Sequence, residues 1–272
     1  MYAEERGEGD GWVVFEAGQG LGRTCWDPVI PLLAGRARLL AYDRAGFGRS
    51  GATTQQLSIG DMAADLVALI GAVVPRPAPL ILVAHSMGGL VARRAAEQLG
   101  PRLRGLLLLD PAQESAPAYD SFGQVARRID RALGVAEVLV RARPLARLVS
   151  GSVRRVYPAD TYAAMLAENV VPAGVAQTRK EIRAVAAAIP QFRAEPPALP
   201  ACPVIVLSAG RPRKGRERQH ADIAAHQRQW AEALPDGRFE EADSGHFIQA
   251  EQPGIVAERA GQLIDRARRA GR

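Results

Sequence analysis

A buried strand that runs directly into a helix is encoded by Leu80-Ile81-Leu82-Val83-Ala84-His85-Ser86-Met87-Gly88-Gly89. The apolar run over residues 80–84 is typical of a strand that is covered on both faces. A serine at so sharp a strand-to-helix turn adopts a strained backbone, which leaves room only for small residues two positions away on either side. Ala84 and Gly88 meet this requirement. We therefore predict that the turn exposes the Ser86 hydroxyl above the sheet, at the positive end of the following helix.

Two interpretations of Ser86 follow from this local pattern. The serine could be a nucleophile, or it could serve only as the N-cap of the next helix. The usual nucleophile pattern is G-x-S-x-G, and here its first position holds Ala84, which is small enough. The preceding strand and the motifs described below favour the catalytic interpretation. In that case the backbone N–H of Met87 can donate to an oxyanion.

Similar apolar runs recur on both sides of this segment and are separated by helical patterns. The other expected strands cover residues 12–17, 37–42, 106–109, 204–207 and 238–242, with one further edge strand over 2–6. The expected helices cover residues 26–33, 59–73, 87–99, 221–234 and 253–267. Strands that alternate with helices predict a doubly wound, mostly parallel sheet of the α/β class.

The alternation stops after Asp110. The segment that follows lacks strand-like runs and reads as helices rich in Ala, Arg and Leu. Prolines expected to break these helices stand at positions 117, 144, 158, 172 and 190. We therefore expect a core made of residues 1–113 and 196–272, with residues 114–195 inserted as a helical cap, or lid.

The composition is that of a globular protein, with 47% hydrophobic and 24% charged residues, which excludes wholesale disorder, collagen and a pure coiled coil. No apolar run approaches the roughly 18 residues of a membrane span, and the first residues form no apolar signal segment, so we expect a cytoplasmic protein. The net charge is +6. Few aromatic residues alternate with the basic ones, so we interpret the charge as solvated surface and expect no nucleic-acid partner. Cys25 and Cys202 are too few for a disulfide framework or a metal site.

Three segments together resemble the α/β-hydrolase superfamily, in particular its serine hydrolases with a lid. The first is the turn at Ser86. The second is AYDRAGFGRS at residues 41–50, which is similar to the D-x-x-G-x-G-x-S loop of the family. The third is SGHF at 244–247 followed by EQP at 251–253, which resembles the catalytic-histidine loop and the last helix. The resemblance extends over nearly all of the core and implies this fold, a metal-free serine hydrolase and no cofactor.

A serine hydroxyl needs a base that removes its proton, and the chain has four histidines. His246 follows a late strand and a Ser-Gly turn, where the resemblance places the general base. His85 precedes the serine, so we expect its side chain to point to the opposite face of the turn and to pack there. His220 and His226 belong to an Arg-rich helix, and we expect them to be exposed to solvent.

The acid that orients this histidine is less clear from the sequence. Many relatives place it just after the strand that here ends at Leu207, but the residues that follow include no acid at the expected position. Asp110 ends the preceding strand, and some families of the superfamily carry their acid there. It could also be only a turn-former before Pro111. We therefore assign Asp110, which keeps the chain order Ser, acid, His. The alternatives that stay open are Glu114, Glu217 and Asp222.

The loop EAGQGLG at residues 16–22 follows a strand and, in the resemblance, matches the H-G-x loop with Ala17 in place of the common histidine. The backbone N–H of Gln19 is then the second oxyanion donor, beside that of Met87. The same loop nearly matches the dinucleotide fingerprint G-x-G-x-x-G. That pattern requires a glycine at position 23, which is Arg23, so we expect no nucleotide cofactor.

Together these features predict that Ser86, Asp110 and His246 hydrolyse a small-molecule ester or thioester through an acyl-enzyme. Thioesterase, lactonase, amidase and cofactor-free haloperoxidase-like activities need the same parts. A non-catalytic binding protein of the same fold is the alternative from another class. The pocket-lining candidates in the cap are Phe122, Tyr162, Met165, Leu166 and Phe192, although residues at helical spacing more often pack within the core. The natural substrate and the oligomeric state are not encoded in any recognisable pattern.

Overall fold

The computed structural model describes residues 1–51 and 57–270, and within them the strands form a single seven-stranded sheet. The strands are β1 (Tyr2–Arg6), β2 (Trp12–Glu16), β3 (Arg38–Asp43), β4 (Leu80–His85), β5 (Leu103–Leu109), β6 (Val204–Ala209) and β7 (Gly237–Ala242). Their order in the sheet is β1-β3-β2-β4-β5-β6-β7. Only β1 runs antiparallel to its neighbour, and all other pairs are parallel. The predicted α/β class and mostly parallel sheet are confirmed.

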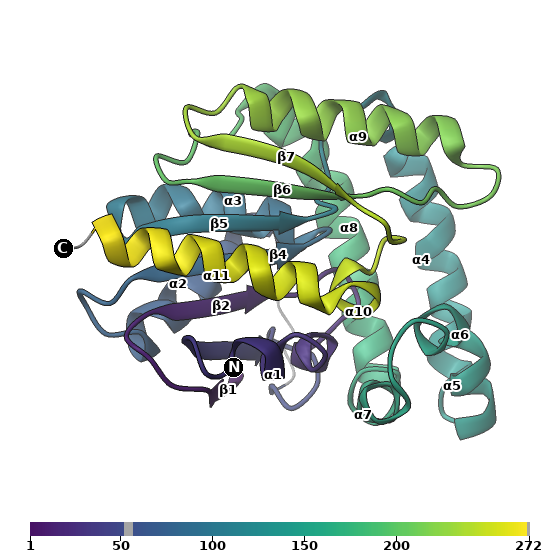
Figure 1. Cartoon of the computed structure of the whole chain (residues 1–272). Helices are drawn as coiled ribbons and strands as arrows, with labels where there is room; N and C mark the ends of the chain where they lie inside the picture. The colour runs from purple at the N-terminus through teal and green to yellow at the C-terminus, as the bar shows by residue number, and fades with distance from the viewer. Residues whose placement is uncertain (52–56, 271–272) are drawn as a thin grey trace.

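Helices cover both faces of this sheet (Figure 1). They are η1 (Arg23–Trp26), α1 (Ile30–Leu33), α2 (Ile59–Val73), α3 (Gly88–Leu99), η2 (Gly100–Arg102), α9 (Glu217–Glu232), α10 (Ile248–Glu251) and α11 (Pro253–Ala270). The single helix expected over residues 26–33 is instead two short helices, η1 and α1. Pro28 lies between them and has no backbone N–H, so it cannot donate a hydrogen bond that would continue one helix into the other.

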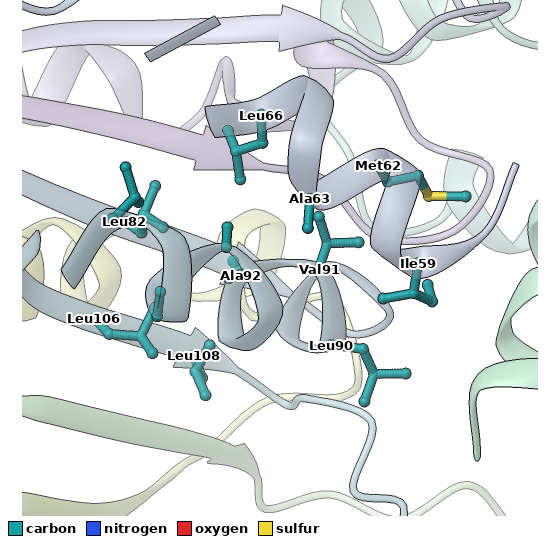
Figure 2. Close-up of a cluster of buried hydrophobic side chains, with 14 of the residues drawn as sticks. Ile59, Met62, Ala63, Leu66, Leu82, Leu90, Val91, Ala92, Leu106 and Leu108 are labelled. Atoms are coloured by element: carbon teal, nitrogen blue, oxygen red, sulfur yellow. The ribbon is translucent and has the colours of Figure 1, made fainter. Parts of the chain in front are cut away.

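The apolar side chains of the parallel strands alternate between two cores, one on each face of the sheet. In β4, Leu80, Leu82 and Ala84 pack toward α2 and α3, whereas Ile81 and Val83 pack toward α1 and α11. Figure 2 shows the first of these cores, where α2 and α3 pack against β4 and β5. Each fully buried Leu or Val contributes roughly 1.5–3 kcal/mol. This burial on both faces explains why the strands read as continuous apolar runs.

Between β5 and β6 the described chain contains only helices. They are η3 (Pro117–Tyr119), α4 (Phe122–Leu139), α5 (Arg143–Val149), α6 (Gly151–Arg154), α7 (Ala159–Glu168) and α8 (Pro172–Ala194). We refer to residues 114–195 as the helical insertion. Figure 1 shows that α4–α8 gather at the end of the sheet to which the parallel strands point. No described helix combines the length and apolar character that a bilayer crossing demands.

Most of the prolines in the insertion stand where a helix begins, as expected. Pro190 is the exception, because it lies inside α8 and does not break it. A proline removes one backbone hydrogen bond from a helix. The neighbouring Ala188, Ile189 and Phe192 are buried, and this packing outweighs the loss.

Candidate active site

Ser86 lies at the turn between β4 and α3, as the sequence predicts. Its φ of 55° is left-handed, and in the described chain only Ser86 and Asp110 show a positive φ without being glycine. Hydrogen bonds from Ser86 N–H to the Leu109 carbonyl and from Gly89 N–H to the Ser86 carbonyl, both 3.0 Å, hold the turn. A Cβ atom on Gly88 would lie 2.6 Å from the Ala17 carbonyl, so the close approach of the neighbouring loop requires glycine there.

Asp110 stands at the end of β5, next to β4 in the sheet, with a φ of 39°. One of its carboxylate oxygens, Oδ2, lies 2.6 Å from Nδ1 of His246. The other, Oδ1, accepts from the side-chain amide of Gln227 at 3.3 Å and from the Ala209 N–H at 3.5 Å. Burial raises the pKa of Asp110, but the hydrogen bond and charge of His246 oppose it and leave the pKa below its ordinary value. The group is therefore a carboxylate at neutral pH.

His246 follows β7 and joins the two residues. Its Nε2 lies 3.0 Å from Oγ of Ser86, while its Nδ1 faces Asp110. Its side chain is 34% exposed, so the imidazole is reachable from solvent. The three side chains form one continuous hydrogen-bonded chain in the order Asp110, His246, Ser86. Such a chain can carry a proton away from the serine hydroxyl.

The other acids that the sequence left open lie elsewhere. Glu217 is exposed and accepts the Gly215 N–H at 2.9 Å. Asp222 is half-buried on α9. Glu114 is buried and forms a two-pronged ion pair with Arg93, at 2.6 and 2.8 Å. None of the three makes a hydrogen bond to His246 within the described chain.

His85 contradicts the expectation that it points away from the site. It is buried, as predicted, but its ring packs against that of His246, with 4.6 Å between ring centroids. Its Nε2 lies 2.8 Å from the carbonyl oxygen of His246, so Nε2 carries the proton and donates. Burial and the neighbouring His246 lower the pKa of His85 to about 3, which keeps the ring neutral. The loop of His246 folds back over the turn and brings the two rings together.

The remaining histidines are also less exposed than expected. His220 and His226 are half-buried on α9. His226 Nδ1 lies 2.8 Å from the carbonyl oxygen of Asp222, one helical turn earlier. Neither histidine bonds to Ser86 in the described structure.

The loop from Ala17 to Gly20 borders the serine, since a Cβ atom on Gly18 would lie 3.3 Å from Cβ of Ser86. Backbone N–H groups of Gln19 and Met87 donate no hydrogen bond to any described residue. Unpaired N–H groups beside a nucleophile can receive a developing oxyanion. Both N–H groups can therefore donate to a ligand, and the oxyanion role of Gln19 and Met87 stays a prediction.

Arg44 binds the backbone of this loop, a role that was not predicted from the sequence. Its guanidinium donates to the carbonyl oxygens of Ala17 at 2.7 Å and Gly18 at 2.8 Å. It also pairs with Glu16 at 2.6 Å and with Glu181 at 2.8 Å. Burial lowers the pKa of Arg44, but the two carboxylates oppose it and leave the pKa above its ordinary value. The guanidinium stays charged although it is only 4% exposed.

Glu181 comes from α8 and is fully buried. One oxygen accepts from Arg44 and the other accepts the N–H of Gly20 at 2.8 Å. A residue of the insertion thus accepts a hydrogen bond from the loop that carries Gln19. Arg44 was visible in the motif at residues 41–50, whereas no local pattern marks Glu181.

The five candidate lining residues pack within the two faces of the core or within the insertion. Met165 and Phe192 are buried, and the other three are half-buried. Tyr162 hydrogen-bonds to Ser150 through its hydroxyl at 2.8 Å. The packing alternative therefore describes these residues better than pocket lining does.

No group of three or more His, Cys, Asp or Glu side chains in the described chain is arranged to hold a metal ion. Cys25 and Cys202 are both buried and unpaired, and burial raises the pKa of each thiol.

The family described as "Alpha/beta hydrolase family" matches residues 13–259. The chain is 32% identical over 145 residues to a protein named "Putative carbamate hydrolase RutD" from Azorhizobium caulinodans, a match that covers 53% of each chain. The chain thus spans about half the length of that curated relative.

Two solved structures share the fold over almost their whole length. A thermophilic esterase from Thermogutta terrifontis is 22% identical, with a TM-score of 0.68 and coverage of 98% of this chain and 93% of the esterase. The enol-lactonase from Burkholderia xenovorans LB400 is 20% identical, with a TM-score of 0.67 and coverage of 97% and 96%. At this level of identity the likeness extends to the fold alone.

Proposed function

Because the chain belongs to the alpha/beta hydrolase family, we propose that it is a serine hydrolase that cleaves a carboxylic ester-type bond through an acyl-enzyme. The observation that carries this proposal is the continuous hydrogen-bonded chain from Asp110 through His246 to Ser86. In that chain a nucleophile, a base and an orienting carboxylate stand in the order that acyl transfer requires.

In the first half of the reaction, Oγ of Ser86 attacks the carbonyl carbon of the ester while Nε2 of His246 takes the hydroxyl proton. The carbonyl oxygen becomes an oxyanion, which accepts hydrogen bonds from the N–H groups of Gln19 and Met87. Each such donor contributes roughly 3 kcal/mol to the transition state. The tetrahedral intermediate collapses, the C–O bond to the alcohol breaks, and Nε2 returns its proton to the leaving alkoxide.

In the second half, water attacks the acyl-enzyme carbonyl and gives its proton to His246. The bond to Ser86 Oγ then breaks, and the serine recovers the proton, so that a carboxylic acid leaves. Asp110 accepts the Nδ1–H of His246 throughout. It thereby fixes the tautomer in which Nε2 is free to accept a proton, and it stabilises the imidazolium.

We further propose that the helical insertion, residues 114–195, acts as a cap over this site. Its contribution to the chemistry is Glu181, which holds the loop of the Gln19 donor through Gly20 and Arg44. Because the insertion also lies at the carboxyl ends of the strands, its shape would set the size of the acyl and alcohol groups accepted.

A fluorophosphonate probe tests the serine chemistry directly. We expect the wild type to be labelled and the Ser86→Ala variant not to be. A folded wild type that stays unlabelled would favour the alternative of a non-catalytic binding protein. A panel of esters, thioesters, lactones and carbamates of varied acyl length then ranks the substrate classes. The carbamate and the lactone are included because proteins named for them match this chain.

A further inference from the structure

Apolar side chains gather on the outer surface of the helical insertion. Of the eleven large hydrophobic side chains that are exposed in the described chain, eight lie between residues 125 and 149, on α4 and α5. Leu148 is 77% exposed, Val138 is 62% exposed and Val135 is 61% exposed. Figure 1 shows α4 and α5 on the side of the insertion that faces away from the sheet. Clustered, exposed apolar side chains of this kind are typical of a surface that binds a partner.

The same segment carries the excess positive charge of the protein. Residues 121–157 contain eight arginines and two acids, a net charge that equals the +6 of the whole chain. The arginines are Arg127, Arg128, Arg131, Arg141, Arg143, Arg147, Arg154 and Arg155. All eight are exposed.

The two acids of this segment do not neutralise the surface. Asp130 and Glu137 turn toward α8, where each pairs with Arg179 at 2.9 Å. None of the eight arginines forms an ion pair with a described residue. Among the described residues outside the helical insertion, by contrast, most arginines form one. The outer surface of α4–α6 therefore presents unpaired cations beside exposed apolar side chains.

The same surface contains a groove. It lies between α5 and α6, has a volume of about 560 Å³, and is lined by Pro144, Arg147, Leu148, Gly151, Arg154 and Arg155. The three guanidinium groups can bind the phosphate of a lipid headgroup. The Leu148 side chain between them can contact the acyl chains of the same lipid.

We propose that the outer surface of α4–α6 binds the surface of an anionic lipid bilayer. Charge complementarity selects this occupant, because anionic headgroups attract clustered arginines while the acyl region accepts exposed Leu and Val side chains. A second copy of the chain would bring the same eight arginines face to face across a symmetric interface. A nucleic acid would pair with the arginines but would leave the apolar side chains in water.

Vesicle co-sedimentation of the full chain tests the proposal. We expect binding to phosphatidylcholine vesicles with about 30% phosphatidylglycerol, and little binding to phosphatidylcholine alone. Arg147→Gln/Arg154→Gln/Arg155→Gln should weaken binding roughly a hundredfold. Leu148→Ser should also weaken it about tenfold, because the apolar side chain inserts beside the headgroups.

A matched control removes three arginines from another surface. Arg213→Gln/Arg216→Gln/Arg218→Gln makes the same change in charge at the start of α9 and should leave binding within about twofold of the wild type. Fluorophosphonate labelling and the melting temperature of each variant show that the fold and the catalytic serine are intact. A failure of the proposed hydrolase chemistry therefore stays distinct from a failure of this proposal.

Several results would overturn the proposal. Equal binding to both kinds of vesicle would show that the arginines do not recognise anionic headgroups. An equal loss in the control would assign the effect to the general charge of the protein. Retained binding in Leu148→Ser, together with tight binding of single-stranded RNA, would identify a polyanion surface instead. A dimer in light scattering that Leu148→Ser separates, without vesicle binding by the wild type, would assign the surface to a second copy.

Discussion

Replacement of Asp110 by asparagine tests the proposed proton path at its carboxylate. In the structure Oδ1 of Asp110 faces two donors, the Gln227 side-chain amide and the Ala209 N–H, whereas Oδ2 faces His246. The carbonyl oxygen of an asparagine would take the Oδ1 position, because its NH₂ group would meet two donors there. The NH₂ group would then point at Nδ1 of His246.

This orientation reverses the tautomer of the histidine. Nδ1 would have to accept a hydrogen bond, so the ring proton would move to Nε2, and Nε2 could no longer take the proton of Ser86. A wrong tautomer of this kind lowers kcat by roughly 10⁴-fold, which corresponds to about 5 kcal/mol at the transition state. The fold should survive, because the substitution is isosteric and Asp110 is held from both sides.

Steady-state hydrolysis of a p-nitrophenyl ester at pH 7.5 gives kcat for the wild type and for Asp110→Asn. Asp222→Asn and Glu217→Gln remove two of the three other candidate acids and should keep kcat within about twofold of the wild type, since surface changes are usually small. Thermal melts establish that each variant is folded. A kcat for Asp110→Asn within about tenfold of the wild type would refute the tautomer argument.

Three further predictions concern two residues that contact the site and Asp27, which follows η1. Glu181→Gln leaves either Arg44 or Gly20 without an acceptor, so the melting temperature should fall by roughly 8 °C and kcat should drop while KM changes little; a wild-type melting curve would contradict this. His85→Phe removes the donor to the His246 carbonyl and should lower kcat about tenfold, as measured on the same ester, and an unchanged kcat would show that the hydrogen bond is dispensable. Burial raises the pKa of Asp27 to about 6, so the native state binds a proton more tightly than the unfolded chain, and stability falls as pH rises from about 4 to 6. Asp27→Asn should therefore be more stable than the wild type at pH 7.5 by about 1 kcal/mol, allowing for its partial exposure, with no difference at pH 4 in denaturant melts.

The strands and the serine turn could be predicted because their signals are local. A strand that is buried on both faces needs a continuous apolar run, and the turn after β4 needs small residues at fixed positions. Asp110 was predicted from the missing acid after Leu207, and the structure places it beside His246. Ser86 and Asp110 follow the adjacent parallel strands β4 and β5, so both lie at the same edge of the sheet, and His246 follows β7 at that edge, two strands from β5.

The contacts that depend on how the insertion docks could not be predicted in this way. Glu181 meets Gly20 across 161 residues of sequence, and nothing in its helical surroundings distinguishes it from a solvent-exposed glutamate. The orientation of His85 depended on the path of a loop that follows it by 161 residues. Sequence spacing describes one element at a time, whereas a buried carboxylate is defined by the partner that a second element supplies.

The sequence by itself determined the α/β architecture, the strained serine turn and the histidine loop, because backbone geometry restricts which residues can occupy them. Only the tertiary structure decided which of the candidate carboxylates meets the histidine, which ion pairs hold the loop of Gln19, and which side of α4 and α5 remains uncovered. The physical reason is that a side chain becomes buried or paired only when a second element packs against it. Helical periodicity shows which side chains of α4 are apolar. Which face of α4 is covered depends on where α8 packs, and that packing leaves Val135 and Val138 in solvent.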